Sequence, residues 1–143
     1  MSSRANLHVA RSSDAGSADS SSAESSASAS GTTLELRPRL GFLGVGWIGR
    51  HRMEAIANSG IADVVAISDA SDEMRAAALE VAPGAEVARS FDELLGMPLD
   101  GVVIATPSAL HAEQSIAALE RGIAVFCQKP LGRNAEENAR VVD

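Results

Sequence analysis

Three glycines spaced Gly-X-Gly-X-X-Gly are the first residues of this sequence that could do chemistry. Gly44, Gly46 and Gly49 follow a short apolar run, and Trp47 and Ile48 lie between the second and the third. In a dinucleotide site the first glycine permits a tight turn, and the second lets the backbone approach a pyrophosphate. The third lets the following helix pack closely on the strand, with its N-terminal N–H groups facing the anion. On its own the motif fits an ordinary glycine-rich turn equally well, since the chain has 12 glycines.

An acidic residue lies where a dinucleotide site requires one. Asp69 follows the second apolar run and stands 20 residues after Gly49, which is the spacing expected of a carboxylate that binds the adenosine ribose. A carboxylate there would repel the 2′-phosphate of NADP, so NAD is the predicted cofactor and NADP the alternative. The structural alternative for Asp69 is a turn or a helix cap.

A cluster of polar residues follows the fourth apolar run. Thr106, Pro107, Ser108 and His111 come directly after the run that ends at Ala105. We expect this loop to contact the ribose and nicotinamide of the cofactor. Two alternatives stay open: Ser108 could instead cap the following helix, and His111 could be solvated.

The chain's only lysine follows the last apolar run. Lys129 stands next to Gln128, and both come directly after Cys127. A lysine beside nicotinamide can serve as a general acid or base, so Lys129 is the candidate catalytic residue, with a surface lysine as the alternative. Cys127 is interpreted as a small buried strand residue. Because it is the only cysteine, no intramolecular disulfide can form, which fits a reducing compartment and predicts a cytoplasmic protein.

The elements that position these residues are short apolar runs alternating with amphipathic stretches. The runs predict strands over residues 40–45, 64–67, 86–88, 101–105 and 123–127. The stretches predict helices over residues 47–58, 72–81, 91–95 and 109–121, and one from about residue 134. Ser71 is expected to cap the second helix, and Gly122 to follow the end of the fourth. The sheet-facing positions expected on the fourth helix are Ala109, Ala112, Ile116 and Leu119.

This alternation predicts an α/β fold with a doubly wound parallel sheet of five strands in the order 3-2-1-4-5. Ligands of such sheets bind at the carboxyl ends of the strands, where the strand order reverses, and all the candidate residues follow strand ends. Residues 1–35 are rich in Ser and Ala without periodic apolar spacing, and we expect a disordered tail. Residues 36–143 are expected to form the dinucleotide-binding domain.

Composition argues against two classes of partner. The net charge is -7, so no basic surface is expected to bind nucleic acid. No run of about 20 apolar residues predicts a membrane span. No cluster of candidate metal ligands is predicted either.

Together these segments resemble the N-terminal domain of the glucose–fructose oxidoreductase, inositol dehydrogenase and rhizopine-catabolism (GFO/IDH/MocA) family. The segments that carry the resemblance are residues 44–51, Asp69, residues 106–111 and residues 128–131. The resemblance implies a Rossmann-type fold, NAD or NADP as cofactor, and a sugar, cyclitol or similar polyhydroxy substrate. It also implies that Lys129 handles the substrate proton. The chain departs from the family pattern at Gln128, where Glu is usual, and at Ser108, where Asn is usual.

The family's second domain supplies its catalytic histidine, most substrate contacts and the oligomer interface, and it is not among these 143 residues. We therefore expect the chain alone to bind nucleotide without turnover. Completion by a second domain would restore the enzyme, and a homo-oligomer or a separate substrate-domain chain is the expected protein partner. The alternatives are a non-catalytic nucleotide-binding or interaction module and a truncated, non-functional gene product.

Overall fold

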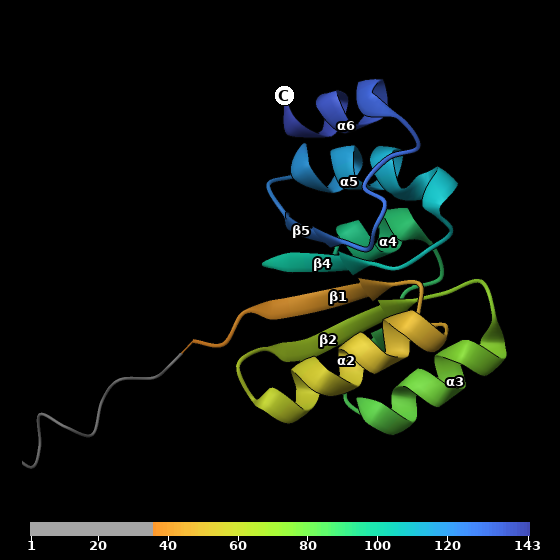
Figure 1. Cartoon of the computed structure of the whole chain (residues 1–143). Helices are drawn as coiled ribbons and strands as arrows, with labels where there is room; N and C mark the ends of the chain where they lie inside the picture. The colour runs from red at the N-terminus through yellow and green to blue at the C-terminus, as the bar shows by residue number, and fades with distance from the viewer. Residues whose placement is uncertain (1–35) are drawn as a thin grey trace, which may run out of the picture. The chain divides into compact units, whose positions relative to one another are not determined.

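A parallel sheet of five strands lies at the centre of the structure, a computed structural model that describes residues 36–143 (Figure 1). The strand order is β3-β2-β1-β4-β5, and every neighbouring pair is parallel, which confirms the predicted order. The strands are β1 (Arg39–Leu43), β2 (Asp63–Ser68), β3 (Glu86–Val87), β4 (Gly101–Ile104) and β5 (Ala124–Cys127). The disordered tail expected over residues 1–35 lies outside the described residues.

Helices cover both faces of the sheet, as the prediction of a doubly wound fold requires (Figure 1). Helices α2 (Trp47–Ser59) and α3 (Asp72–Val81) lie on one face. On the other face lie α4 (Phe91–Leu95), α5 (His111–Leu119) and α6 (Ala135–Val142), the last of which packs against α5. Right-handed crossovers produce this division, because the chain adds strands in one direction from β1 to β3 and in the other from β4 to β5.

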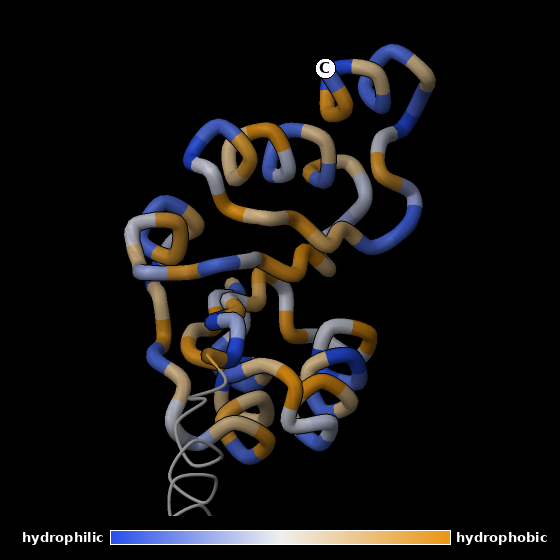
Figure 2. The backbone as a smooth tube through the Cα atoms, turned by 90° about the vertical axis from the view of Figure 1, so that its left-hand side faces the viewer, coloured by the Kyte–Doolittle hydropathy of each residue, from blue (hydrophilic) through white to orange (hydrophobic). Residues whose placement is uncertain are grey.

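The hydrophobic core is double because successive strand residues point to opposite faces of a sheet. Phe42 of β1 and Ile67 of β2 pack against Met53 of α2 on one face. Leu43 of β1 belongs to the other cluster, with Ala118 of α5. Figure 2 shows hydrophobic colour concentrated along the strands and alternating with hydrophilic colour around the helices.

Helix ends follow the sequence closely. The Ser71 hydroxyl accepts a hydrogen bond from the Met74 amide at 3.3 Å, so Ser71 caps α3 as predicted. Asn134 caps α6, which was expected to begin at about this residue. Gly122 has a φ of 73° and follows the end of α5, as predicted.

The start of α5 differs from the prediction. A 3-10 turn, η1 (Ser108–Leu110), precedes the helix, and the side chain of Ser108 makes no capping bond to it. The turn is closed by the Leu110 amide, which donates to the Pro107 carbonyl at 3.0 Å. The alternative that Ser108 caps the helix is therefore wrong, because a 3-10 turn that begins at Ser108 separates this residue from the start of α5.

The buried face of α5 also differs from the prediction. Ala109 lies in the 3-10 turn and is exposed, and Leu119 is exposed, so neither packs on the sheet. Two polar residues take part in the buried face, which hydropathy could not indicate. The buried residues of α5 are His111, Ala112, Ser115 and Ala118.

Within residues 36–143, no helix combines the length and the apolar character that crossing a membrane requires.

Candidate functional site

The glycine turn begins immediately after β1. Gly44 has a φ of 83°, and a Cβ there would lie 2.8 Å from the Ala105 carbonyl carbon. A Cβ at Gly49 would overlap the Gly44 carbonyl oxygen, so α2 packs directly on the turn. Gly46 differs from both, because a Cβ there would meet nothing within 4 Å. The first and third glycines are thus required by the packing of the protein, whereas the second borders open space.

The N-terminus of α2 presents unpaired backbone donors to that space. The first intrahelical bond of α2 runs from the Arg50 amide to the Gly46 carbonyl at 2.8 Å, and no side chain caps the helix. The amides of Trp47, Ile48 and Gly49 precede this bond and have no acceptor within the helix. These donors and the positive end of the helix dipole suit a phosphate group.

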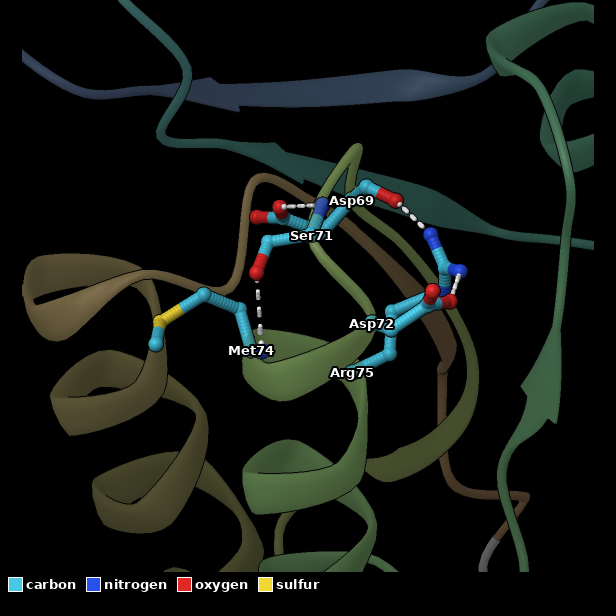
Figure 3. Close-up of polar contacts among 5 residues, drawn as sticks. All are labelled: Asp69, Ser71, Asp72, Met74 and Arg75. Atoms are coloured by element: carbon cyan, nitrogen blue, oxygen red, sulfur yellow. Dashed lines mark hydrogen bonds and ion pairs between the residues drawn. The ribbon is translucent and has the colours of Figure 1, made fainter.

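Asp69 directly follows β2 and connects two parts of the site. Its carboxylate accepts a hydrogen bond from the Val45 amide at 2.8 Å. It accepts another from the Ser71 amide at 2.8 Å (Figure 3). The residue thereby joins the glycine turn to the start of α3. Each carboxylate oxygen has a second lone pair, so both can still accept a bond from a ligand hydroxyl.

An arginine fixes the backbone of Asp69 from the other side. The Arg75 guanidinium donates to the Asp69 carbonyl oxygen and pairs with the carboxylate of Asp72 (Figure 3). The Asp72 side chain is 96% exposed, whereas that of Arg75 is only 24% exposed. Arg75 was not predictable as a site residue, because its role depends on contacts that α3 makes with the preceding turn.

One cleft, of about 630 Å³, brings together five of the predicted residues at the carboxyl end of the sheet. They are Gly44, Gly46, Asp69, Thr106 and Pro107. The lining residues that were not predicted include Arg89, Ser90, Phe91 and Gln114. The first three follow β3, so the rule that ligands bind at the ends of strands could have found them. Because β3 is only two residues long, it gives the weakest strand signal in the sequence.

A second cleft, of about 720 Å³, contains three other predicted residues, Trp47, Ile48 and Gln128. Arg52 also lines this cleft, and its Nη2 donates a hydrogen bond to Gln128 Oε1 at 2.8 Å. The Arg52 guanidinium carbon also lies 5.3 Å from the centre of the Phe126 ring. The predicted site residues are therefore divided between two clefts, and Gln128 is held by a side chain of α2.

The remaining predicted residues line neither cleft. Ser108 is exposed in η1, and Lys129 is exposed directly after Gln128. His111 is only 1% exposed, so the alternative that it is solvated is wrong. Its Nδ1 lies 2.7 Å from the Pro130 carbonyl oxygen and its Nε2 lies 2.7 Å from that of Thr106. Both ring nitrogens are thus engaged by the backbone.

The Cys127 thiol is in a poor position to act as a nucleophile. Burial raises the pKa of this thiol, and its proximity to the Ser115 hydroxyl opposes the rise only in part. Since the thiolate is the reactive form, a raised pKa leaves less of it at neutral pH.

We expect a disulfide reagent such as dithionitrobenzoate to modify Cys127 of the folded chain about tenfold more slowly than a free cysteine at pH 8. Full reactivity should return in denaturant, which is the matched control on the same thiol. Equal rates in the folded and unfolded chains would contradict a partly buried thiol with a raised pKa.

The described part of the chain contains no group of three or more His, Cys, Asp or Glu residues that could hold a metal ion.

Comparison with known proteins gives a consistent result. The family described as "Oxidoreductase family, NAD-binding Rossmann fold" matches residues 38–143. The inositol 2-dehydrogenase of Acidiphilium cryptum is 39% identical over 109 residues, which cover 73% of this chain and 32% of that protein. The rhizopine catabolism protein MocA of Rhizobium meliloti is 32% identical over 109 residues, which cover 75% of this chain and 33% of that protein.

Solved structures show the same fold. The myo-inositol dehydrogenase of Lactobacillus casei, in complex with NAD(H) and myo-inositol, superimposes with a TM-score of 0.71 at 29% identity. The match covers 76% of this chain and 33% of that one. The WlbA dehydrogenase of Bordetella pertussis, in complex with NADH and UDP-GlcNAcA, gives a TM-score of 0.69 at 35% identity over 75% of this chain and 33% of that one.

The chain spans about a third of the length of the relatives it matches. Its five-stranded sheet, its glycine turn and the family match over residues 38–143 agree with one another. The chain belongs to the GFO/IDH/MocA oxidoreductase family, and residues 38–143 are its NAD-binding Rossmann fold.

Proposed function

We propose that this chain binds NAD across the carboxyl end of its sheet. The pyrophosphate would lie on the free amides at the start of α2, and the adenosine ribose would bind the carboxylate of Asp69. The nicotinamide would lie toward the loops that follow β4 and β5. One observation carries this proposal: a single cleft contains Gly46, where a side chain would meet nothing, together with Asp69 and Thr106.

The preference for NAD over NADP rests on charge. A 2′-phosphate would lie close to the Asp69 carboxylate and be repelled by it. The neighbouring Arg75 could neutralise that phosphate, but its guanidinium is already paired with Asp72 and the Asp69 carbonyl. The alternative preference for NADP would have to rest on Arg89, which lines the same cleft.

The proposed reaction is hydride transfer with a sugar, cyclitol or related polyhydroxy substrate. NAD supplies the nicotinamide carbon that takes the hydride from a substrate C–H. Lys129 would accept the proton of the same carbon's hydroxyl, so that a carbonyl forms. Support comes from the relatives, which include inositol dehydrogenases, and from the place of Lys129 two residues after the end of β5. We assign the orientation of the substrate to a second domain. Without such a domain, the chain would bind NAD but would not catalyse the reaction.

A non-catalytic nucleotide-binding module is the second candidate. The observation that favours it is Gln128. Because this residue is a glutamine, no carboxylate stands next to Lys129 in the chain, and its side-chain oxygen accepts a hydrogen bond from Arg52. A module of this kind would bind NAD as proposed above but show no activity with any polyhydroxy compound when a substrate domain is supplied.

Calorimetric titration of the 143-residue chain with NAD and, separately, NADP tests the proposal. We expect saturable binding at one site, with NAD bound about tenfold more tightly than NADP, a difference of about 1.4 kcal/mol. A folded chain that binds neither nucleotide would overturn the proposal. Tighter binding of NADP would overturn only the role given to Asp69.

A further inference from the structure

We propose that His111 is a positioning residue that fixes the backbone of Lys129 by joining the two loops that flank the nicotinamide position. The inference rests on the proposed function, in which Lys129 moves the substrate proton. His111 itself lines neither cleft and would touch neither substrate nor cofactor.

The contacts of the ring carry this inference. His111 is the first residue of α5 and is almost completely buried. One ring nitrogen lies 2.7 Å from the carbonyl oxygen of Pro130, the residue after Lys129. The other lies 2.7 Å from the carbonyl oxygen of Thr106, two residues after the end of β4. A single buried side chain thereby ties the loop after β5 to the loop after β4.

Imidazole is suited to this task by its shape. Its two nitrogens lie on different sides of one rigid ring, so the ring can span two carbonyl oxygens that face each other across it. A neutral ring donates to one of them and a protonated ring to both, because a carbonyl oxygen only accepts. A glutamine amide carries both of its N–H groups on one nitrogen and can donate to one of the two carbonyl oxygens. A phenylalanine ring fills a similar volume and donates to neither.

A second anchor holds the residue before Lys129. The side chain of Gln128 accepts the bond from Arg52, and its backbone amide donates to the Ile104 carbonyl at 2.8 Å. Arg52 belongs to α2 and His111 to α5, and these helices cover opposite faces of the sheet (Figure 1). Lys129 thus lies between two residues that are held from opposite sides, while its own side chain is exposed. Such an arrangement fixes the backbone and leaves the amine free to reach a substrate.

Because Lys129 is the only lysine, the test can be read from one signal. Growth with ¹⁵N-lysine gives a single backbone amide resonance, whose order parameter reports the mobility of this residue. In the unmodified chain without nucleotide we expect an order parameter of about 0.85, that of rigid backbone. In His111→Phe we expect about 0.6 or less, and in His111→Gln an intermediate value.

Ser115→Ala is the matched control. Ser115 is buried on the same helix one turn later, and its hydroxyl has no hydrogen-bond partner in the described part of the chain. We expect this variant to leave the Lys129 order parameter unchanged. The comparison therefore separates loss of the two loop contacts from general loosening of α5.

A second measurement shows whether His111 positions Lys129 or supports the cofactor site as a whole. Added NAD should shift the Lys129 resonance of the unmodified chain. In His111→Phe the affinity for NAD should stay within about threefold, a change of about 0.7 kcal/mol, while the Lys129 shift is lost. A chain that does not bind NAD would overturn the proposed function, yet the measurements without nucleotide would still decide whether His111 fixes Lys129.

Two results would overturn the inference. One is a mobile Lys129 in the unmodified chain, which needs no variant to be observed. The other is an unchanged order parameter in a folded His111→Gln or His111→Phe chain. If His111→Phe does not fold, the milder His111→Gln variant and the unmodified chain together give the decision.

Discussion

Replacing Gly46 by alanine is expected to abolish most NAD binding while leaving the fold intact. A Cβ at this position meets nothing within 4 Å, and the φ of -63° is available to any residue, so the fold has no reason to change. The new methyl group would occupy the space through which the pyrophosphate approaches the α2 amides. We expect affinity for NAD to fall about 100-fold, or about 2.7 kcal/mol, by calorimetry.

Gly49→Ala is the matched variant with the opposite pattern of effects. Its Cβ would overlap the Gly44 carbonyl oxygen and approach the Ala105 Cβ to 3.4 Å, so α2 would have to move away from the turn. We expect the free energy of unfolding to fall by about 3 kcal/mol, as for overpacking of a tight contact, measured by urea denaturation. Full NAD affinity in Gly46→Ala, or unchanged stability in Gly49→Ala, would contradict the separate roles of the two glycines.

Asp69→Ala is expected to reduce both stability and cofactor discrimination. Loss of the carboxylate leaves the Val45 and Ser71 amides without their acceptor, which should cost about 1–3 kcal/mol in the free energy of unfolding. NAD affinity should fall about tenfold or more, and the preference over NADP should disappear. Urea denaturation and calorimetry with both nucleotides measure these effects.

Asp69→Asn separates the charge of this residue from its hydrogen bonds. The amide oxygen can still accept from a backbone amide, so stability should fall less than in Asp69→Ala. The negative charge is gone in both variants, so the preference for NAD should be lost in both. Asp72→Ala removes a carboxylate that is 96% exposed on the same turn, and it should leave the free energy of unfolding nearly unchanged. A full NAD preference in Asp69→Asn would show that Asp69 serves only the turn.

The sheet was predictable because its strands are short aliphatic runs bounded by glycine and polar residues. Such runs are typical of strands buried on both faces, and their regular alternation with helical stretches left few arrangements open. Helix ends were predictable where one side chain or one backbone angle decides them, as at Ser71 and Gly122. The first strand ends at Leu43, two residues before the predicted end, because Gly44 turns the chain.

The interior of α5 was not predictable from hydropathy. His111 is a polar residue whose burial depends on two carbonyl oxygens supplied by distant loops. Burial of a polar group is favourable only when such partners exist, and a sequence pattern does not place them. Because hydropathy gives no signal for a buried histidine, the helix was expected to begin at Ala109, where the apolar spacing starts, and not at His111.

The division of the candidate residues between two clefts was also not predictable. Strand ends place all of them at one edge of the sheet, but side chains decide which share a cavity. The contact of Arg52 with Gln128 joins residues 76 positions apart and draws Gln128 toward α2. Asp69 instead remains with the glycine turn, through its bond to Val45.

A crystal structure of the chain with bound NADH tests the central claim most directly. We expect the pyrophosphate on the backbone amides at the start of α2, the adenosine ribose hydroxyls on the Asp69 carboxylate, and the nicotinamide beside the loops after β4 and β5. A dinucleotide bound elsewhere, or bound with its pyrophosphate away from the glycine turn, would contradict the account.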